Sequence, residues 1–154
     1  MRKLTKRFII FSLDNLALSN PIRYERYYIT STLRIQKKDN KYQKEILDKD
    51  NNVIEKKDIS QIEFLKLKEA AYSYIIRDSY LLLKDNRISI KKYLGKYKGL
   101  YRVELSFNSI KEKNEYVKED WMGEEITSSP LAFDKDLSKL SDNEFQKELK
   151  KYLK

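Results

Sequence analysis

The sequence contains no cysteine and no histidine, and these two absences exclude several classes of chemistry. Without cysteine there are no disulfides, no thiolate metal ligands and no cysteine nucleophile. Without histidine there is no Ser-His-Asp triad, no usual general base and no usual zinc ligand. A metal ion bound here would therefore be a hard cation such as Mg²⁺ or Mn²⁺, held by carboxylates.

Glycine, proline and long apolar runs are also scarce. Three glycines and two prolines in 154 residues argue against low-complexity sequence and proline-rich linkers. No run of about 18 apolar residues is present, so we expect no membrane span. The apolar run at 8–11 is too short for the core of a signal peptide. These features predict a single cytoplasmic domain over residues 1–154, without a membrane partner.

Basic residues are abundant. Lysine and arginine number 33 against 24 acidic residues, which gives a formal net charge of +9. Such a balance favours anionic partners, namely nucleotides, polyphosphates or nucleic acid. A lysine-rich surface that only keeps the protein in solution is an equally good explanation of the charge taken alone.

Strand signals dominate the pattern along the chain, since tyrosine, isoleucine and threonine fit a pleated surface. Short turns separate the segments, and Ser141 precedes Glu144 at the spacing of a capping box. Many antiparallel strands in one small domain indicate a sandwich or a closed barrel. We expect strands at 2–10, 22–30, 31–38, 41–48, 53–64, 78–86, 87–95 and 100–108, and helices at 65–76, 109–118 and about 141–153.

Polar side chains recur at alternate positions of the expected strands. In the first strand Lys3, Thr5 and Arg7 share one face, while apolar residues occupy the other. On a single strand such a face is best explained as a solvated exterior, but over all strands a polar lumen becomes a competitive interpretation. The later alternating residues are Arg34, Gln36, Lys44, Glu63, Arg77, Lys91 and Glu104.

The second half of the chain resembles the CYTH family, the triphosphate tunnel metalloenzymes. ISIKKYLGKYKGLYRVELSF (88–107) is similar to a strand, a Gly-x-x-x-Gly-Leu turn and an Ala-Glu-x-Glu strand of that family. WMGEEITSS (121–129) resembles its Trp-Leu-Gly-x-Glu-Val-Thr. LAFDKDLSK (131–139) loosely follows its closing Tyr-x-Asn-x-x-Leu, with Lys135 at the Asn position. The matching residues are Tyr93, Gly95, Gly99, Leu100, Glu104, Trp121, Gly123, Glu125, Thr127, Phe133 and Leu137.

The first half agrees in the order of its motifs, so the resemblance covers nearly the whole chain. TLRIQ (32–36) stands for Val-Arg-x-Arg, and YQK (42–44) stands for Thr-x-Lys. QIE (61–63) stands for Glu-x-Glu, and IIRDSY (75–80) stands for Ile-Lys-x-Arg-Tyr.

The resemblance implies an α+β fold, an eight-stranded antiparallel β-barrel with flanking helices, whose lumen binds a triphosphate. Basic side chains would clamp the phosphates and glutamates would hold Mg²⁺ or Mn²⁺, a geometry that suits phosphoryl transfer. In such a lumen we expect the phosphate ligands of this chain to be Arg7, Arg34, Lys44, Arg77 and Lys91. Lys3 and Glu63 are then polar lumen residues, and any metal would be held by Glu104 and Glu125.

The sequence departs from the family pattern in its acidic residues. The first-strand Glu-x-Glu-x-Lys is replaced by Lys3, Thr5 and Arg7. Lys91 replaces an Asp, while Gln61 and Ser106 each replace a Glu. Two arginine positions are also neutral, Gln36 and Ser79. The lumen is thereby more cationic, which disfavours a divalent cation through Coulomb repulsion.

Three functions are compatible with these residues. The first is a catalytically weakened or inactive tunnel that binds a nucleotide, triphosphate or polyphosphate. The second is an active Mg²⁺- or Mn²⁺-dependent enzyme, either a triphosphatase or a class IV-like adenylyl cyclase. The third, less favoured, is a nucleic-acid binder in which some of the 12 tyrosines stack on bases. Tyrosines in strands and core explain the same residues better.

Overall fold

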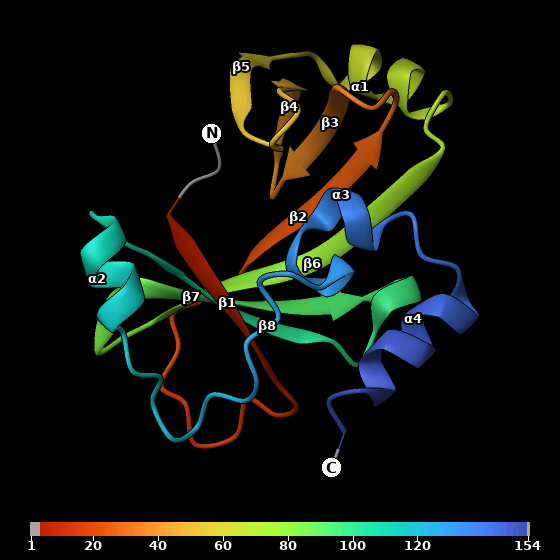
Figure 1. Cartoon of the computed structure of the whole chain (residues 1–154). Coiled ribbons are helices and arrows are strands. Elements are labelled where there is room, and N and C mark those ends of the chain that lie inside the picture. Colours follow the sequence, from red (N-terminus) through yellow and green to blue (C-terminus); the bar gives the residue numbers. More distant parts are fainter. Residues whose placement is uncertain (1–3, 154) are drawn as a thin grey trace.

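The chain forms one antiparallel sheet of eight strands, with helices inserted after the fifth and eighth strands (Figure 1). The computed structural model describes residues 4–153. The strands are β1 (Thr5–Ile10), β2 (Ile22–Tyr28), β3 (Leu33–Lys38), β4 (Lys41–Leu47), β5 (Val53–Asp58), β6 (Ser73–Leu82), β7 (Asp85–Leu94) and β8 (Tyr101–Ser106). The helices are α1 (Gln61–Lys68), α2 (Ile110–Glu115), α3 (Asp134–Leu137) and α4 (Asp142–Lys150), with the 3-10 turns η1 (Gly95–Tyr97) and η2 (Pro130–Ala132).

The strand order is β1-β8-β7-β6-β2-β3-β4-β5, and every pairing is antiparallel. The eight antiparallel strands expected from the sequence are therefore confirmed. Among residues 4–153, no strand pairing joins β1 to β5. The free edge of β1 instead bonds to the segment 123–127, where the Ile126 amide donates to the Arg7 carbonyl and the Gly123 amide to the Ile9 carbonyl.

Side chains from all eight strands line one internal pocket, so the sheet must curve around it. In Figure 1 the strands β2 to β5 rise on one side of this space, and β1, β7 and β8 cross below them. Ala132 of η2 and Asp134 of α3 line the same pocket. The curvature brings the alternating polar faces of separate strands toward one another.

The region after β5 differs from the expectation. The strand expected at 53–64 ends at Asp58, and the helix expected at 65–76 begins earlier, at Gln61. The physical reason is a helix cap, because the Ser60 side chain accepts a hydrogen bond of 3.1 Å from the Glu63 amide. The helix ends at Lys68, and β6 then begins at Ser73 rather than at 78.

Two helices cover the sheet with buried aromatic side chains. Phe64 of α1 is 2% exposed and packs against the rings of Tyr27 and Tyr42. Phe145 of α4 is fully buried and meets the Tyr97 ring at 5.1 Å. The capping box predicted at the start of α4 is present, with both reciprocal hydrogen bonds made. Several tyrosines thus belong to the core, as the sequence suggested.

Nowhere in residues 4–153 does a helix have the length and apolar character needed to cross a membrane.

Candidate functional site

The inner face of the sheet encloses a pocket of about 310 Å³ that is rich in arginine. We call it the basic pocket. Its cationic lining residues outnumber the acidic ones by eight to four, so it carries a formal excess of positive charge. The cations are Arg7, Arg26, Arg34, Lys56, Arg77, Lys91, Arg102 and Lys135, and the acids are Glu45, Asp50, Glu104 and Asp134.

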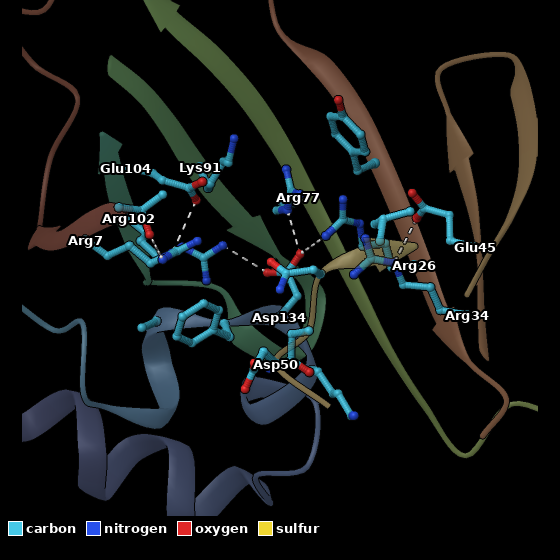
Figure 2. A pocket seen from close by; sticks show the side chains of 18 of the residues that line it. Arg7, Arg26, Arg34, Glu45, Asp50, Arg77, Lys91, Arg102, Glu104 and Asp134 are labelled. Atoms are coloured by element: carbon cyan, nitrogen blue, oxygen red, sulfur yellow. Dashed lines mark hydrogen bonds and ion pairs between the residues drawn. The ribbon is translucent and has the colours of Figure 1, made fainter. Parts of the chain in front are cut away.

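One end of the basic pocket is built on β1, β7 and β8, and we call it the Glu104 end (Figure 2). Arg7 lies opposite Glu104 in the β1–β8 register, with Arg7 Nε 3.4 Å from Glu104 Oε2. Arg7 Nη1 also donates to Thr5 Oγ1 at 2.5 Å. Burial by itself would raise the pKa of the Glu104 carboxyl, but the charges of Arg7 and Lys91 lower it overall.

Lys91 contributes an ammonium group to the same end. Its Nζ donates to Ser89 Oγ at 3.1 Å, and its cross-strand neighbour on β8 is Arg102. Burial, followed by the repulsion from Arg77, lowers the pKa of Lys91 to about 7. A bound anion would offset both effects, because it would supply the opposite charge that this amine lacks.

The other end is built on β3, β4 and β5, and we call it the Glu45 end (Figure 2). Arg34 lies opposite Glu45 in the β3–β4 register, and its Nε donates to Glu45 Oε1 at 2.8 Å. Lys56 of β5 places its Nζ 3.5 Å from Glu45 Oε2. Burial would raise the pKa of the Glu45 carboxyl, yet Arg34 and the neighbouring cations keep it below its ordinary value.

Asp134 occupies the centre of the basic pocket, between the two ends (Figure 2). Its Oδ2 accepts from Arg26 Nη1 and Arg77 Nε, both at 2.9 Å. Its Oδ1 accepts from Tyr93 Oη at 2.5 Å and from Arg102 Nη2 at 3.2 Å. Burial would raise the pKa of this carboxyl, but the surrounding guanidinium groups hold it well below its ordinary value. We call these three arginines, Arg26, Arg77 and Arg102, the arginine cluster.

The segment 129–137 holds Asp134 in place. The Ser129 side chain caps η2 by accepting from the Leu131 amide at 3.0 Å. Leu131 and Leu137 are fully buried and anchor the segment in the core. Phe133 places its ring under the Arg7 guanidinium, with 4.2 Å from the Arg7 Cζ to the ring centroid. The first residue of α3 is therefore fixed inside the curved sheet.

The structure brings five of the sequence-predicted site residues into one pocket. Four are expected phosphate ligands and one is an expected metal ligand, and each comes from a different strand. They share one pocket because each lies on the inward face of its strand. They are Arg7, Arg34, Arg77, Lys91 and Glu104.

Lys44 and Glu63 lie elsewhere, contrary to the expectation of a lumen position. In the β3–β4 register Lys44 is opposite Ile35, one residue out of phase with the Arg34–Glu45 pair, so it belongs to the outer face. Glu63 is in α1, outside the sheet, rather than in a strand. The two side chains form an ion pair with each other, Nζ to Oε2 at 3.8 Å.

Glu125 also lies away from the basic pocket. It forms an antiparallel bridge with Phe8 on the edge of β1, and its side chain is exposed in a surface groove beside Glu148. The expected pairing of Glu104 with Glu125 around a metal is therefore not assembled. Lys3, the remaining predicted lumen residue, lies outside the described residues.

Glu45, Arg102, Asp134 and Arg26 are among the charged pocket residues that the sequence motifs did not predict, although three of these four left a signal. The two-residue turn after Lys38 sets the β3–β4 register and places Glu45 opposite Arg34. Arg102 precedes Glu104 by two positions and so shares its face. Counted back from Leu137, the family's Tyr-x-Asn-x-x-Leu puts its polar residue at Asp134 rather than at Lys135. For Arg26 the sequence carries no comparable motif.

The acidic groups of the pocket do not fit a catalytic metal pair. Within residues 4–153, no group of three or more acidic side chains is arranged to hold a metal ion. Glu104 forms an ion pair with Arg7, Glu45 is hydrogen-bonded to Arg34, and Asp134 forms ion pairs with the arginine cluster. Mg²⁺ prefers about six oxygen ligands, and carboxylates that already neutralise buried arginines are poor candidates for that role.

Solved structures with the same fold exist. The chain resembles the crystal structure of the inorganic triphosphatase NE1496, with a TM-score of 0.73 and 17% identity over 92% of this chain and 97% of that one. A second crystal structure, that of the hypothetical protein NE1496, gives a TM-score of 0.72 and 18% identity over 88% and 97%. No family model and no curated protein sequence matches the chain. The likeness confirms the triphosphate tunnel fold that the sequence motifs indicated.

Proposed function

We propose that this protein binds a phosphorylated anion, namely a nucleotide, a triphosphate or a polyphosphate, inside the curved sheet. The observation that carries the proposal is the composition of the basic pocket, where eight cations face four acids. Arginine pairs with phosphate oxygens through two parallel hydrogen bonds, and lysine acts as a point charge. On this view Arg7 and Lys91 contact the phosphates directly, and Arg34 and Arg77 add positive charge to the same pocket.

Two buried donor atoms support a ligand at the Glu104 end. Arg7 Nε and Arg102 Nε are buried and have no hydrogen-bond partner among residues 4–153, although Arg7 Nε stays within ion-pair distance of Glu104. Buried donors that lack a hydrogen bond cost free energy, roughly 1–3 kcal/mol each. Phosphate oxygens placed beside Arg7, Lys91 and Arg102 would satisfy these donors and would offset the repulsion among the cations.

Binding on this proposal does not depend on a divalent metal, and catalysis is weakened or absent. The carboxylates that would hold Mg²⁺ or Mn²⁺ are missing from the first strand or are already paired with arginine. A complex of metal and phosphate also carries less negative charge than the free anion, so a cationic pocket attracts it less strongly.

The alternative is a metal-dependent triphosphatase or a class IV-like adenylyl cyclase. The likeness in fold to the inorganic triphosphatase NE1496 favours it. In that case Glu104 would ligate the metal, and substrate phosphates and water would complete the shell. Nucleic-acid binding has less support, because Tyr27, Tyr28, Tyr93 and Tyr97 are buried and cannot stack on bases.

Thermal unfolding with a panel of ligands tests the proposal. Tripolyphosphate, ATP and thiamine triphosphate are each added in EDTA and again with Mg²⁺ or Mn²⁺. A ligand at about 100 times its dissociation constant adds roughly 2.7 kcal/mol, which raises the Tm by about 5–10 °C. We expect the shift in EDTA. A shift that appears only with metal contradicts the proposal and supports the enzyme.

The Glu104→Gln variant separates the two functions. In a binding pocket this substitution removes a negative charge, so the affinity for the free anion should rise or stay constant. In a metalloenzyme it removes a metal ligand, so metal-dependent phosphate release should disappear. Glu124→Gln is the matched control, because Glu124 does not line the basic pocket and loses the same charge.

A further inference from the structure

Asp134 is bound by the sheet in the way that a phosphate group would be bound. Four donors from four strands, β2, β6, β7 and β8, converge on its two oxygens. The carboxylate itself comes from α3, outside the sheet (Figure 2). One part of the chain thus supplies a complete oxyanion site, and a separate segment supplies the anion that fills it.

The arginine cluster is held in position by further contacts that do not involve Asp134. Arg26 Nε donates to Gln36 Oε1 at 3.0 Å, and Arg77 Nη1 donates to Ser79 Oγ. Arg102 Nη1 donates to the Leu131 carbonyl at 3.1 Å. The direction of each guanidinium group therefore has its own support, and the site should persist when another anion replaces the carboxylate.

Asp134 also separates the Glu104 end from the Glu45 end (Figure 2). Among the residues that line the pocket, the buried donors without hydrogen-bond partners are Arg7 Nε and Arg102 Nε, which come from β1 and β8, two of the strands that form the Glu104 end. A phosphate group bound there has free donors available. A phosphate group placed further along the pocket would meet the Asp134 carboxylate, and the two negative charges repel.

Resting on the proposed function, we propose that Asp134 fills one anion subsite of the basic pocket and thereby limits the length of the phosphate chain that binds. The ligand lies at the Glu104 end, and its last phosphate stops beside Asp134. Asp134 is in this sense a specificity-determining residue. An additional phosphate brings no gain in affinity to the wild-type protein, because the arginine cluster is already neutralised from within.

The test compares chain lengths in the Asp134→Asn variant. Binding of pyrophosphate, tripolyphosphate and tetrapolyphosphate is measured by calorimetry in EDTA, for the wild type, D134N and E45Q. The control E45Q removes the same charge from the same pocket but leaves Asp134 in place. A new charge-assisted contact corresponds to roughly tenfold or more in affinity. We therefore expect the ratio of the affinity for tetrapolyphosphate to the affinity for pyrophosphate to be roughly tenfold or more higher in D134N than in the wild type.

The control defines what would overturn the inference. E45Q should strengthen the binding of all three probes by a similar factor, because it changes only the charge. If D134N does the same and leaves the length preference unchanged, Asp134 does not limit chain length. If no probe binds the wild type, the proposed function is wrong. The experiment on Asp134→Ala then tests separately whether Asp134 fills an anion subsite.

Asp134→Ala leaves the arginine cluster without an internal anion, and inorganic phosphate is the probe. We expect D134A to melt below the wild type, and millimolar phosphate to raise its Tm by several times the shift seen in the wild type. If D134A folds only when phosphate is present, the subsite is supported. Equal shifts in both proteins, or failure of D134A to fold at any phosphate concentration, would overturn it.

Discussion

Lys91 and Arg102 lie opposite each other on the paired strands β7 and β8, and both side chains line the basic pocket. Like charges in directly opposed positions of an antiparallel pair destabilise a sheet. Burial, which removes water from the ammonium of Lys91, and the repulsion from Arg77 together lower the pKa of this group to about 7. The arrangement lowers stability in the absence of a ligand and favours an anion, which is a common compromise at binding sites.

Replacing Lys91 with methionine should therefore stabilise the protein. A lysine with a lowered pKa binds fewer protons in the folded than in the unfolded state between pH 7 and about 10.4, so its presence makes the free energy of unfolding rise with pH over that interval. Below pH 7 the cost of the charged lysine is fully present. We expect K91M to exceed the wild type by about 1 kcal/mol or more at pH 6, and the difference to vanish toward pH 10. Urea unfolding across this range measures it.

Lys92→Met is the control for that experiment. Lys92 neighbours Lys91 in β7 but projects from the opposite face of the strand and does not line the basic pocket. K92M should change stability by at most about 0.5 kcal/mol. An equal gain in K92M would show that net charge, rather than the position of Lys91, is responsible.

Anion affinity should depend on pH through the same lysine. Protonation of Lys91 adds a positive charge beside the ligand, so affinity should fall as pH rises from 7 to 9, by up to about tenfold per pH unit. Comparison with K91M removes the effect of any change in the charge of the ligand itself over this interval. Tripolyphosphate titrations in EDTA at several pH values provide the measurement. K91M should bind more weakly at pH 7 and should not show the fall in affinity with pH, whereas a fall that persists in K91M would point to another group.

Arg34 and Lys44 should differ in their effect on the anion. Arg34 lines the basic pocket beside Glu45, whereas Lys44 lies on the outer face and pairs with Glu63. Arg34→Gln should weaken tripolyphosphate binding by roughly three- to tenfold, because the lost charge lies in the same pocket although it does not touch the ligand. Lys44→Gln removes the same charge and should leave affinity within about twofold at physiological salt. An equal loss of affinity in both variants would show that the net charge of the protein, rather than the position of Arg34 in the pocket, controls binding.

Gly123 should tolerate no side chain. A Cβ at this position would lie 2.3 Å from the Ile9 carbonyl oxygen, in the backbone of β1. Gly123→Ala would push the segment 123–127 away from β1, at a cost of about 2–4 kcal/mol in the free energy of unfolding.

Gly95→Ala is the comparison for that prediction. Gly95 has φ +65°, but beyond its chain neighbours nothing lies within 4 Å of the place that an added methyl group would take. Only backbone strain of about 1 kcal/mol is therefore expected. Chemical denaturation of both variants measures the difference. If G123A is no less stable than G95A, the close contact between the segment and β1 does not hold the edge of the sheet.

Much of the fold was predictable because its signals are local. The alternation of polar and apolar residues identifies the strands, and turn residues divide them. The α1 region was misjudged for the same reason, since Ser60 and Glu63 form a local cap that outweighs the strand-like pattern around them. Because α1 begins about four residues earlier than expected, β6 also begins earlier, at Ser73 instead of 78.

The sequence by itself determined which side chains face inward on five strands, those of Arg7, Arg34, Arg77, Lys91 and Glu104, because side chains alternate with a period of two. It could not place Glu45 and Lys44 correctly without the register, since a slip of one residue exchanges the two faces of a strand. Only the tertiary structure decided that Asp134, far from any strand in sequence, enters the pocket and binds the arginine cluster. That contact joins residues 32 to 108 positions apart, a separation at which no local pattern carries information.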